Sequence, residues 1–254
     1  MSMVSKFKSS TAVLALALVL STGLAGCATG PKASASSDVV ISDPLEPFNR
    51  TMLSFNEILD KFFFNPINTA YRVIVPQFGR DAVHNVLENL KSPVYLANEI
   101  LQGDIKGAGR VLTRFAINTT VGIGGLMDSA SSNGLPYQPE DFGQTLATWG
   151  VGSGPYIVWP ILGPSTLRDS VGFVGDIAMD PIYWYGKNTD REWISYTRAG
   201  LTLIDTKDRT RNMLEDLRRN SGDYYTALQS VYVQRRNALI NDMDPGRQSL
   251  PDIE

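Results

Sequence analysis

The stretch from Asp141 to Asp169 constrains the fold of this chain more than any other. Between these two aspartates the first ionisable side chain is Arg168, so every residue from 142 to 167 is uncharged. Glycines and prolines interrupt the stretch so densely that no continuous helix can run through it. An irregular backbone cannot face lipid tails, because its N–H and C=O groups would lack hydrogen-bond partners. The stretch is therefore either packed inside protein or lines a water-filled cavity.

Composition excludes several classes of site. The chain has 254 residues, a formal net charge of −3, one cysteine and one histidine. The length allows one large domain or two small ones. A single cysteine excludes an internal disulfide, and a single histidine excludes a histidine-rich metal site within one chain. The mild acidity gives no basic footprint for nucleic acid. We expect no nucleic-acid partner, no metal site and no bound cofactor.

The first residues have the pattern of a secretory signal peptide. Lys6 and Lys8 precede a short apolar run at residues 12–20, and small residues follow it. The run is too short to span a membrane as a helix. The sequence Leu24-Ala25-Gly26-Cys27 resembles the lipobox of bacterial lipoproteins. That resemblance implies a signal peptide over residues 1–26, whereas an ordinary signal peptide with a chance cysteine is the alternative.

The lipobox resemblance also implies a covalent lipid on Cys27, the only cysteine of the chain. Each buried CH₂ of an acyl chain contributes about 0.8 kcal/mol, so several chains hold a protein on a membrane. The residue after the cysteine is Ala28 and not the aspartate associated with inner-membrane retention, which favours the outer membrane. Residues 28–42 are small and polar and predict a flexible tether. Residues 27–42 would therefore form an anchor that keeps the folded part near the bilayer.

Helical periodicity begins after Pro44. Apolar residues recur at alternating spacings of four and three and predict one helix with an apolar stripe: Phe48, Met52, Phe55, Leu59 and Phe62. Packing in a core and contact with acyl chains both explain such a stripe. Asn65-Pro66 predicts the end of this helix, and Ser92-Pro93 predicts the start of another. Gly103 is expected to end that helix, and Asp104 to cap the next one.

Further helices are expected over residues 105–118 and 190–220, the latter with four apolar residues facing inward: Trp193, Ile194, Leu201 and Ile204. No segment shows a sustained strand alternation, so the sequence predicts an all-α domain over residues 43–240. A mobile tail is expected over residues 241–254.

The helix at residues 105–118 carries a row of cations, of which Arg110 and Arg114 lie four residues apart. A solvated face explains such a row, and contact with anionic phosphate groups is the alternative. His84 lies off the apolar stripe of its own segment, which favours a solvated surface histidine over a catalytic one. No nucleotide-binding loop is present, and nothing in the sequence directs a serine toward His84. We therefore expect that the protein is not an enzyme.

Three blocks of sequence resemble a known family. They are Asp43-Pro44-Leu45-Glu46-Pro47-Phe48-Asn49-Arg50, the segment from Thr113-Arg114-Phe115 to Gly124-Gly125-Leu126-Met127-Asp128, and the segment from Phe142-Gly143 through Trp149-Gly150-Val151-Gly152 to Arg168-Asp169. These blocks are similar to those of the MlaA (VacJ) family of outer-membrane phospholipid-transport lipoproteins. The resemblance extends from Asp43 to about Ile240, and the third block is its most specific part.

The family resemblance implies a single ring-like domain of helices with irregular Gly/Pro-rich connections, seated on the periplasmic side in the inner leaflet of the outer membrane. An amphipathic channel would remove mislocalised phospholipid from the outer leaflet, pass it to a periplasmic carrier protein and so maintain lipid asymmetry. Trimeric porins would be membrane partners. Gly143, Gly150, Gly152, Gly154 and Pro155 are expected to shape the channel, because glycines let the backbone approach closely. Arg110 and Arg114 are expected to contact head groups. The alternative is a structural lipoprotein that binds porins and transports nothing.

Overall fold

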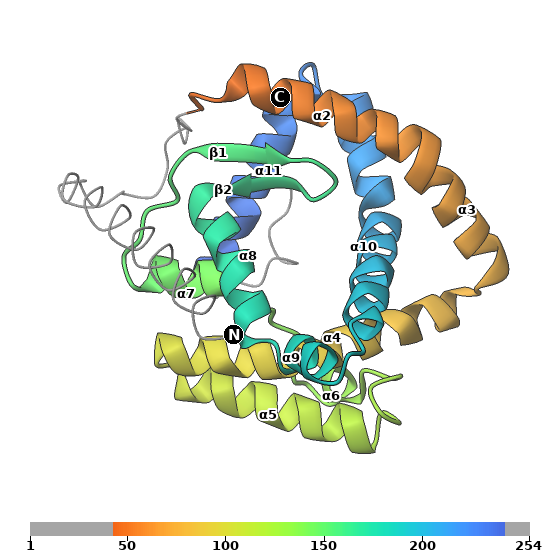
Figure 1. Ribbon diagram of the computed structural model, residues 1–254, viewed down its shortest axis with the longest axis vertical. Coiled ribbons are helices and arrows are strands. Elements are labelled where there is room, and N and C mark those ends of the chain that lie inside the picture. The colour runs from red at the N-terminus through yellow and green to blue at the C-terminus, as the bar shows by residue number, and fades with distance from the viewer. Residues whose placement is uncertain (1–42, 242–254) are drawn as a thin grey trace, which may run out of the picture. The chain divides into compact units, whose positions relative to one another are not determined.

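The computed structural model describes residues 43–241 of the chain (Figure 1). The predicted signal peptide, the predicted acylation site Cys27 with its predicted tether, and residues 242–254 of the predicted tail lie outside the described residues. Helices make up most of the described part, which confirms the all-α prediction. The helices are α2 (Glu46–Leu59), a π-helical turn η1 (Asp60–Phe64), α3 (Asn65–Ile74), α4 (Gln77–Gln102), α5 (Ile105–Thr120), α6 (Ser129–Ser132), α7 (Phe142–Thr148), α8 (Leu167–Met179), α9 (Pro181–Asn188), α10 (Trp193–Asn220) and α11 (Tyr224–Ile240).

Contacts between elements close a circuit within residues 43–241 (Figure 1). Helix α2 leads through η1 and α3 to α4, which contacts α7, and α7 packs on α8. Helix α8 contacts the second strand of a small hairpin, and the first strand of that hairpin packs against α2. Helix α10 contacts α3, α4, α9 and α11, while α11 reaches α7 and the hairpin. A ring-like domain requires such a circuit. The circuit also brings the hairpin, which belongs to the uncharged stretch, against α2.

Both predicted helix breaks at proline are wrong. The π-helical turn joins α2 to α3 without a break, because the Asn65 N–H donates to the Asp60 carbonyl five residues back and Pro66 follows as an early residue of α3. Pro93 lies inside α4, which is continuous for 26 residues. Proline removes one hydrogen bond of a helix, but α4 packs along α5 and against α7, and these contacts hold it together. The predicted boundary at Gly103 is confirmed, since Gly103 is left-handed with φ of 81° and Asp104 caps α5.

The expectation of no strands is also wrong at one place. Two strands, β1 (Tyr156–Trp159) and β2 (Gly163–Thr166), pair antiparallel, with Tyr156 opposite Thr166 and Trp159 opposite Gly163. Each strand has only four residues, too few to show an alternation in the sequence. Side chains of α2 hold the hairpin: Asn49 bonds to the Tyr156 carbonyl and the Val158 N–H, and Asn56 bonds to the Trp159 carbonyl and the Ile161 N–H.

Polar side chains occupy many of the buried positions, while large apolar ones lie outside. Six asparagines are buried in the described residues, namely Asn49, Asn56, Asn68, Asn89, Asn98 and Asn118. In the predicted apolar stripe, Phe48 and Phe55 of α2 and Phe62 of η1 are 47%, 43% and 72% exposed, so core packing does not explain them. Of the predicted inward positions of α10, Trp193 and Leu201 are exposed and Ile194 and Ile204 are partly buried, while Asp205 and Asp208 are buried. No helix within residues 43–241 has both the length and the hydropathy to cross a membrane.

Two glycines let α7 and α8 approach backbone to backbone. A Cβ atom added at Gly172 would lie 2.4 Å from the Gly143 nitrogen and 2.6 Å from its Cα. We therefore expect Gly172→Ala to force the two helices apart and to lower the free energy of unfolding by about 1–3 kcal/mol. Gly200→Ala in α10 is the matched control, because nothing lies within 4 Å of its added Cβ. That control should gain about 0.5–1 kcal/mol, since alanine favours helix. Equal effects of the two substitutions in denaturant unfolding would contradict the close contact.

Candidate functional site

A cavity of about 430 Å³ lies between the hairpin, α8 and α11. One part of its lining is apolar and includes Trp159, Leu162, Phe173 and Val174. Another part is charged or polar and includes Asp141, Ser165, Asp169, Ser170, Asp176, Tyr232 and Arg236. The cavity is therefore amphipathic. Part of the uncharged stretch lines it, through the hairpin, while Gly143 and its neighbours in α7 are packed inside the protein.

Arg236 of α11 joins the two aspartates that bound the uncharged stretch. Its two terminal nitrogens donate to both carboxylate oxygens of Asp141, at 2.6 and 3.0 Å, and its Nη2 atom also donates to Asp169 Oδ1 at 2.8 Å. The Tyr232 hydroxyl donates to the other oxygen of Asp169 at 2.5 Å, and Arg168 Nε lies 3.1 Å from Oδ1. The guanidinium of Arg236 therefore binds the residues at both ends of the uncharged stretch, so that α11 holds the two ends together.

Helix caps explain why the two aspartates lie where they do. Asp141 is the N-cap of α7 and accepts a hydrogen bond from the Gln144 N–H at 2.9 Å. Thr166 is the N-cap of α8 and accepts from the Asp169 N–H at 3.2 Å, which places Asp169 in the first turn of that helix. A carboxylate is favourable there because the N-terminal end of a helix is partly positive.

The electrostatic environments of Asp169 and Asp176 differ. Burial alone would raise the pKa of Asp169, but Arg236, Tyr232 and Arg168 outweigh it and hold that pKa below its ordinary value. Asp176 forms no ion pair with any residue between 43 and 241: its Oδ1 atom accepts from Asn98 Nδ2 at 3.0 Å and from the Phe142 N–H at 2.9 Å. Burial raises the pKa of Asp176 to about 6, and the Asn98 hydrogen bond opposes this shift only in part. Asp169 is thus already bound by cations, whereas Asp176 can still bind one.

The predicted channel-shaping residues occupy their positions for different structural reasons. A Cβ at Gly143 would lie 2.7 Å from Asp169 Oδ1 and 2.9 Å from Arg236 Nη2, so glycine is needed beside the carboxylates. Gly150 and Gly154 adopt positive φ angles of 87° and 66°. Gly152 has neither feature. The Pro155 carbonyl accepts from the Leu167 N–H at 3.1 Å and so helps to close the base of the hairpin. That these residues shape a channel stays a prediction.

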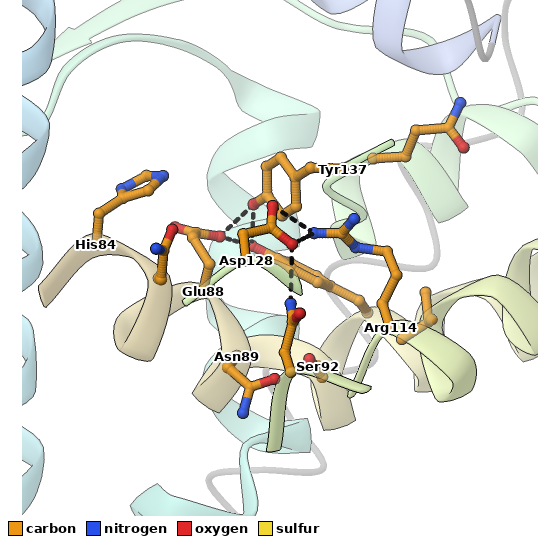
Figure 2. A pocket seen from close by; sticks show the side chains of 12 residues that line it. His84, Glu88, Asn89, Ser92, Arg114, Asp128 and Tyr137 are labelled. Carbon is orange, nitrogen blue, oxygen red and sulfur yellow. Dashed lines mark hydrogen bonds and ion pairs between the residues drawn. The ribbon is translucent and has the colours of Figure 1, made fainter. Parts of the chain in front are cut away.

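A second cavity, of about 140 Å³, lies between α4, α5 and the loop after α5. Its charged groups are directed at one another (Figure 2). Both oxygens of Asp128 accept from Arg114 at 3.0 Å, and Glu88 accepts from the hydroxyls of Tyr95 and Tyr137. This network fastens the loop to α4 and α5. We therefore assign it a structural role.

The predicted head-group arginines have protein partners in the structure. Arg114 is buried and bound to Asp128, to Ser131 and to the Leu135 carbonyl. Arg110 lies 3.7 Å from the buried Glu99. Contact of either arginine with a head group stays a prediction.

His84 is not the solvated surface residue that its position off the apolar stripe favours. Its Nδ1 atom lies 2.7 Å from Asp205 Oδ2, and the ring is partly buried between α4 and α10. The sequence missed this pair because 121 residues separate the two partners. Arg236 and Asp176 were missed for the same reason. The only signal pointing to the site was the position of Asp141 and Asp169 at the two ends of the uncharged stretch.

The match to a protein family decides the identity of the chain. Residues 41–239 match the family described as MlaA lipoprotein. The chain belongs to the MlaA lipoprotein family. It is 35% identical over 244 residues to MlaA of Escherichia coli (strain K12), an alignment that covers 94% of this chain and 93% of that protein. The identity to MlaA of Haemophilus influenzae is 31% over 251 residues, which cover 95% and 96% of the two chains.

A solved MlaA-like chain has the same fold. It comes from work described as the structural basis for maintenance of bacterial outer membrane lipid asymmetry, and it superposes on this chain with a TM-score of 0.68. The two are 35% identical, and the match covers 79% of this chain and all of the solved one.

Two of the three sequence blocks that resemble MlaA meet in this structure, and the other is held by a contact within itself. Asn49 of the first block bonds to the backbone of Tyr156 in the third. Within the second block, Arg114 pairs with Asp128. These contacts explain why the blocks have the residues they have.

Proposed function

We propose that this chain is an outer-membrane lipoprotein that transports phospholipid between membranes. The relatives from Shigella flexneri and Escherichia coli are both named intermembrane phospholipid transport system lipoprotein MlaA. The amphipathic cavity is the observation that supports this function best. A phospholipid has a charged head group and apolar chains, and the cavity has carboxylates and a guanidinium beside Trp159, Leu162, Phe173 and Val174.

A protected passage removes the main barrier to lipid transfer. A charged head group loses its hydration when it crosses hydrocarbon, and a polar group without a partner costs several kcal/mol. We infer that the cavity is part of an amphipathic channel through which mislocalised phospholipid leaves the outer leaflet. Polar groups of the cavity would replace part of the hydration of the head group, while its apolar side accepts the chains. Lipid asymmetry of the outer membrane would be the result.

Exposed apolar side chains support partial embedding in the membrane from the periplasmic side. Val73, Ile74 and Phe78, around the junction of α3 and α4, are 81%, 77% and 78% exposed. Phe48 and Phe55 of α2 are exposed as well, and exposed apolar side chains of this size are typical of surfaces that contact protein or membrane. A diacylglycerol and an acyl chain on Cys27 would add the anchor.

Two protein partners follow from the family resemblance. The relatives are named as parts of a transport system, and a system needs a component that accepts the lipid. We propose a periplasmic phospholipid-carrier protein in that place and a trimeric porin as the neighbour in the membrane. A structural lipoprotein that binds porins without transporting lipid is the competing function, and it gives no reason for an amphipathic cavity.

Deletion of the gene tests the transport function. Phospholipid exposed on the cell surface should rise after deletion and fall again when the full chain is supplied from a plasmid. The Cys27→Ser chain should not restore the low level, because it lacks the acylated anchor. Surface phospholipid can be measured by labelling intact cells with an amine reagent and by outer-leaflet phospholipase digestion. An unchanged level in the deletion strain would refute transport and favour the structural alternative.

A further inference from the structure

The charges that line the large cavity are not balanced. Among the described residues, three carboxylates face it, from Asp141, Asp169 and Asp176, and Arg236 is the one cationic side chain in the lining. Both terminal nitrogens of Arg236 are already bonded to Asp141 and Asp169. Arg168 adds a second cation behind the lining, again at Asp169. Asp141 and Asp169 are thus neutralised within the protein, and Asp176 is left over.

Asp176 presents an oxygen that the protein does not use. Its Oδ1 atom is held by Asn98 and by the Phe142 N–H, which fix the orientation of the carboxylate. Asn98 is fully buried and is itself held by the Thr145 hydroxyl at 2.8 Å and by the Val94 carbonyl. Within residues 43–241, Oδ2 of Asp176 has no hydrogen-bond or ion-pair partner, although the residue lines the cavity. A fixed carboxylate with a free oxygen in a partly buried site favours a cationic partner.

We propose that Asp176 makes the cavity selective for phospholipids whose head group carries an ammonium ion, such as phosphatidylethanolamine. This inference rests on the proposed transport function. An ammonium group has three N–H donors and no acceptor, so it fits the free Oδ2 atom and supplies the missing positive charge. A head group that carries only the phosphate charge brings a second anion toward the carboxylate and gains no partner there. The raised pKa of Asp176 agrees with a carboxylate that lacks such a partner in the empty cavity.

Selectivity can be measured with a defined lipid mixture. The full-length protein is equilibrated with detergent micelles that contain equal amounts of phosphatidylethanolamine and phosphatidylglycerol, then purified by gel filtration, and its lipid is quantified by mass spectrometry. The wild-type protein should retain about tenfold more phosphatidylethanolamine, as expected for one charge-assisted hydrogen bond at the lower end of its usual range. Asp176→Asn should bring this ratio close to one. Asp176→Glu should keep most of the preference, because it retains the charge.

Asp190→Asn is the matched control. It makes the same chemical change at an exposed position outside the cavity lining, and its ratio should equal that of the wild type. Lipid bound at the outer apolar surface is the same in both variants, so their difference reports the cavity. A wild-type ratio near one, or equal ratios for Asp176→Asn and Asp190→Asn, would overturn the selectivity while leaving transport in place. If the wild-type protein retains no more phospholipid than an unrelated lipoprotein does, the proposed transport function itself fails.

Discussion

Arg236→Met is expected to lower the free energy of unfolding of residues 43–241 by about 3–5 kcal/mol, the cost of leaving a buried charge without its partner. Methionine has a similar length but no charge, so Asp141 and Asp169 would both lose the guanidinium that they share. Asp169 would be affected most, because its side chain is only 9% exposed. Its pKa should rise, since burial then acts with less opposition. Chemical denaturation followed by circular dichroism measures the loss of stability.

Arg235→Met is the control for this substitution. Arg235 is the preceding residue of α11 and is exposed, so the same change there should shift stability by less than about 0.5 kcal/mol. Arg236→Lys separates charge from geometry, because an ammonium cannot bond to two carboxylates with the fixed fork of a guanidinium. It should therefore recover part of the loss. If Arg236→Met lowered the free energy of unfolding no more than Arg235→Met does, the ion pairs of Arg236 with Asp141 and Asp169 would not stabilise the protein in solution.

The same substitution should impair transport. Asp141 caps α7 and Asp169 lies in the first turn of α8. Their shared guanidinium therefore holds together the helix that precedes the hairpin in the sequence and the helix that follows it. Release of this joint changes the position of the hairpin, which forms one wall of the cavity. We expect the Arg236→Met strain to expose surface phospholipid at a level near that of the deletion strain, at equal protein abundance. Immunoblotting of the outer-membrane fraction checks the abundance.

Local signals in the sequence predicted local structure well. Asp104 was expected to cap a helix and does so through the N–H groups of Lys106 and Gly107. Gly103 ends the preceding helix as expected. The uncharged stretch was correctly expected to contain no continuous helix. Each of these features depends on a few neighbouring residues, and such interactions can be inferred from spacing alone.

The errors share one physical cause, which is that distant contacts overrule local ones. Pro93 is tolerated inside α4 because neighbouring helices support that helix. The strands of the hairpin are too short to be recognised, and two asparagines of α2, about a hundred residues earlier, hold them. Arg236 could not be assigned to the site because Asp141 lies 95 residues away.

Which face of a helix is buried was also harder to predict than where the helix ends. An apolar stripe indicates which residues share a helix face, and it does not indicate whether that face meets protein or lipid. On α2 the stripe is exposed, while Asn49 and Asn56 on another face are buried. On α10 the buried residues are Asp205 and Asp208: Asp208 pairs with Arg72 of α3 and Arg80 of α4, and Asp205 bonds to His84 of α4. These buried polar side chains bond to partners on distant segments, and the apolar periodicity of one helix does not reveal such partners.

Among substitutions in α2 that keep the size of the side chain, Asn49→Asp should lower the free energy of unfolding most. Asn49 is fully buried; its amide donates to the Tyr156 carbonyl and to Asp43, and its oxygen accepts from the Val158 N–H. A carboxylate keeps the acceptor but loses the donor, and it lies about one hydrogen-bond length from Asp43. We expect a loss of about 3–5 kcal/mol at pH 7, as for an unpaired buried charge. Asn212→Asp makes the same change on the exposed face of α10 and should shift stability by less than about 0.5 kcal/mol.

The pH dependence of this loss identifies its cause. Burial and the neighbouring Asp43 should raise the pKa of the introduced carboxyl in the folded state above its unfolded value. The folded state then binds a proton more tightly, so the loss is complete above the folded pKa and shrinks as pH falls toward the unfolded value. Below the folded pKa the protonated carboxyl can donate to the Tyr156 carbonyl again. The stability difference between Asn49→Asp and the wild type should therefore be much smaller at pH 4 than at pH 7, in parallel denaturant titrations. A difference that does not change with pH would mean that shape, and not the lost donor and the added charge, destabilises the hairpin.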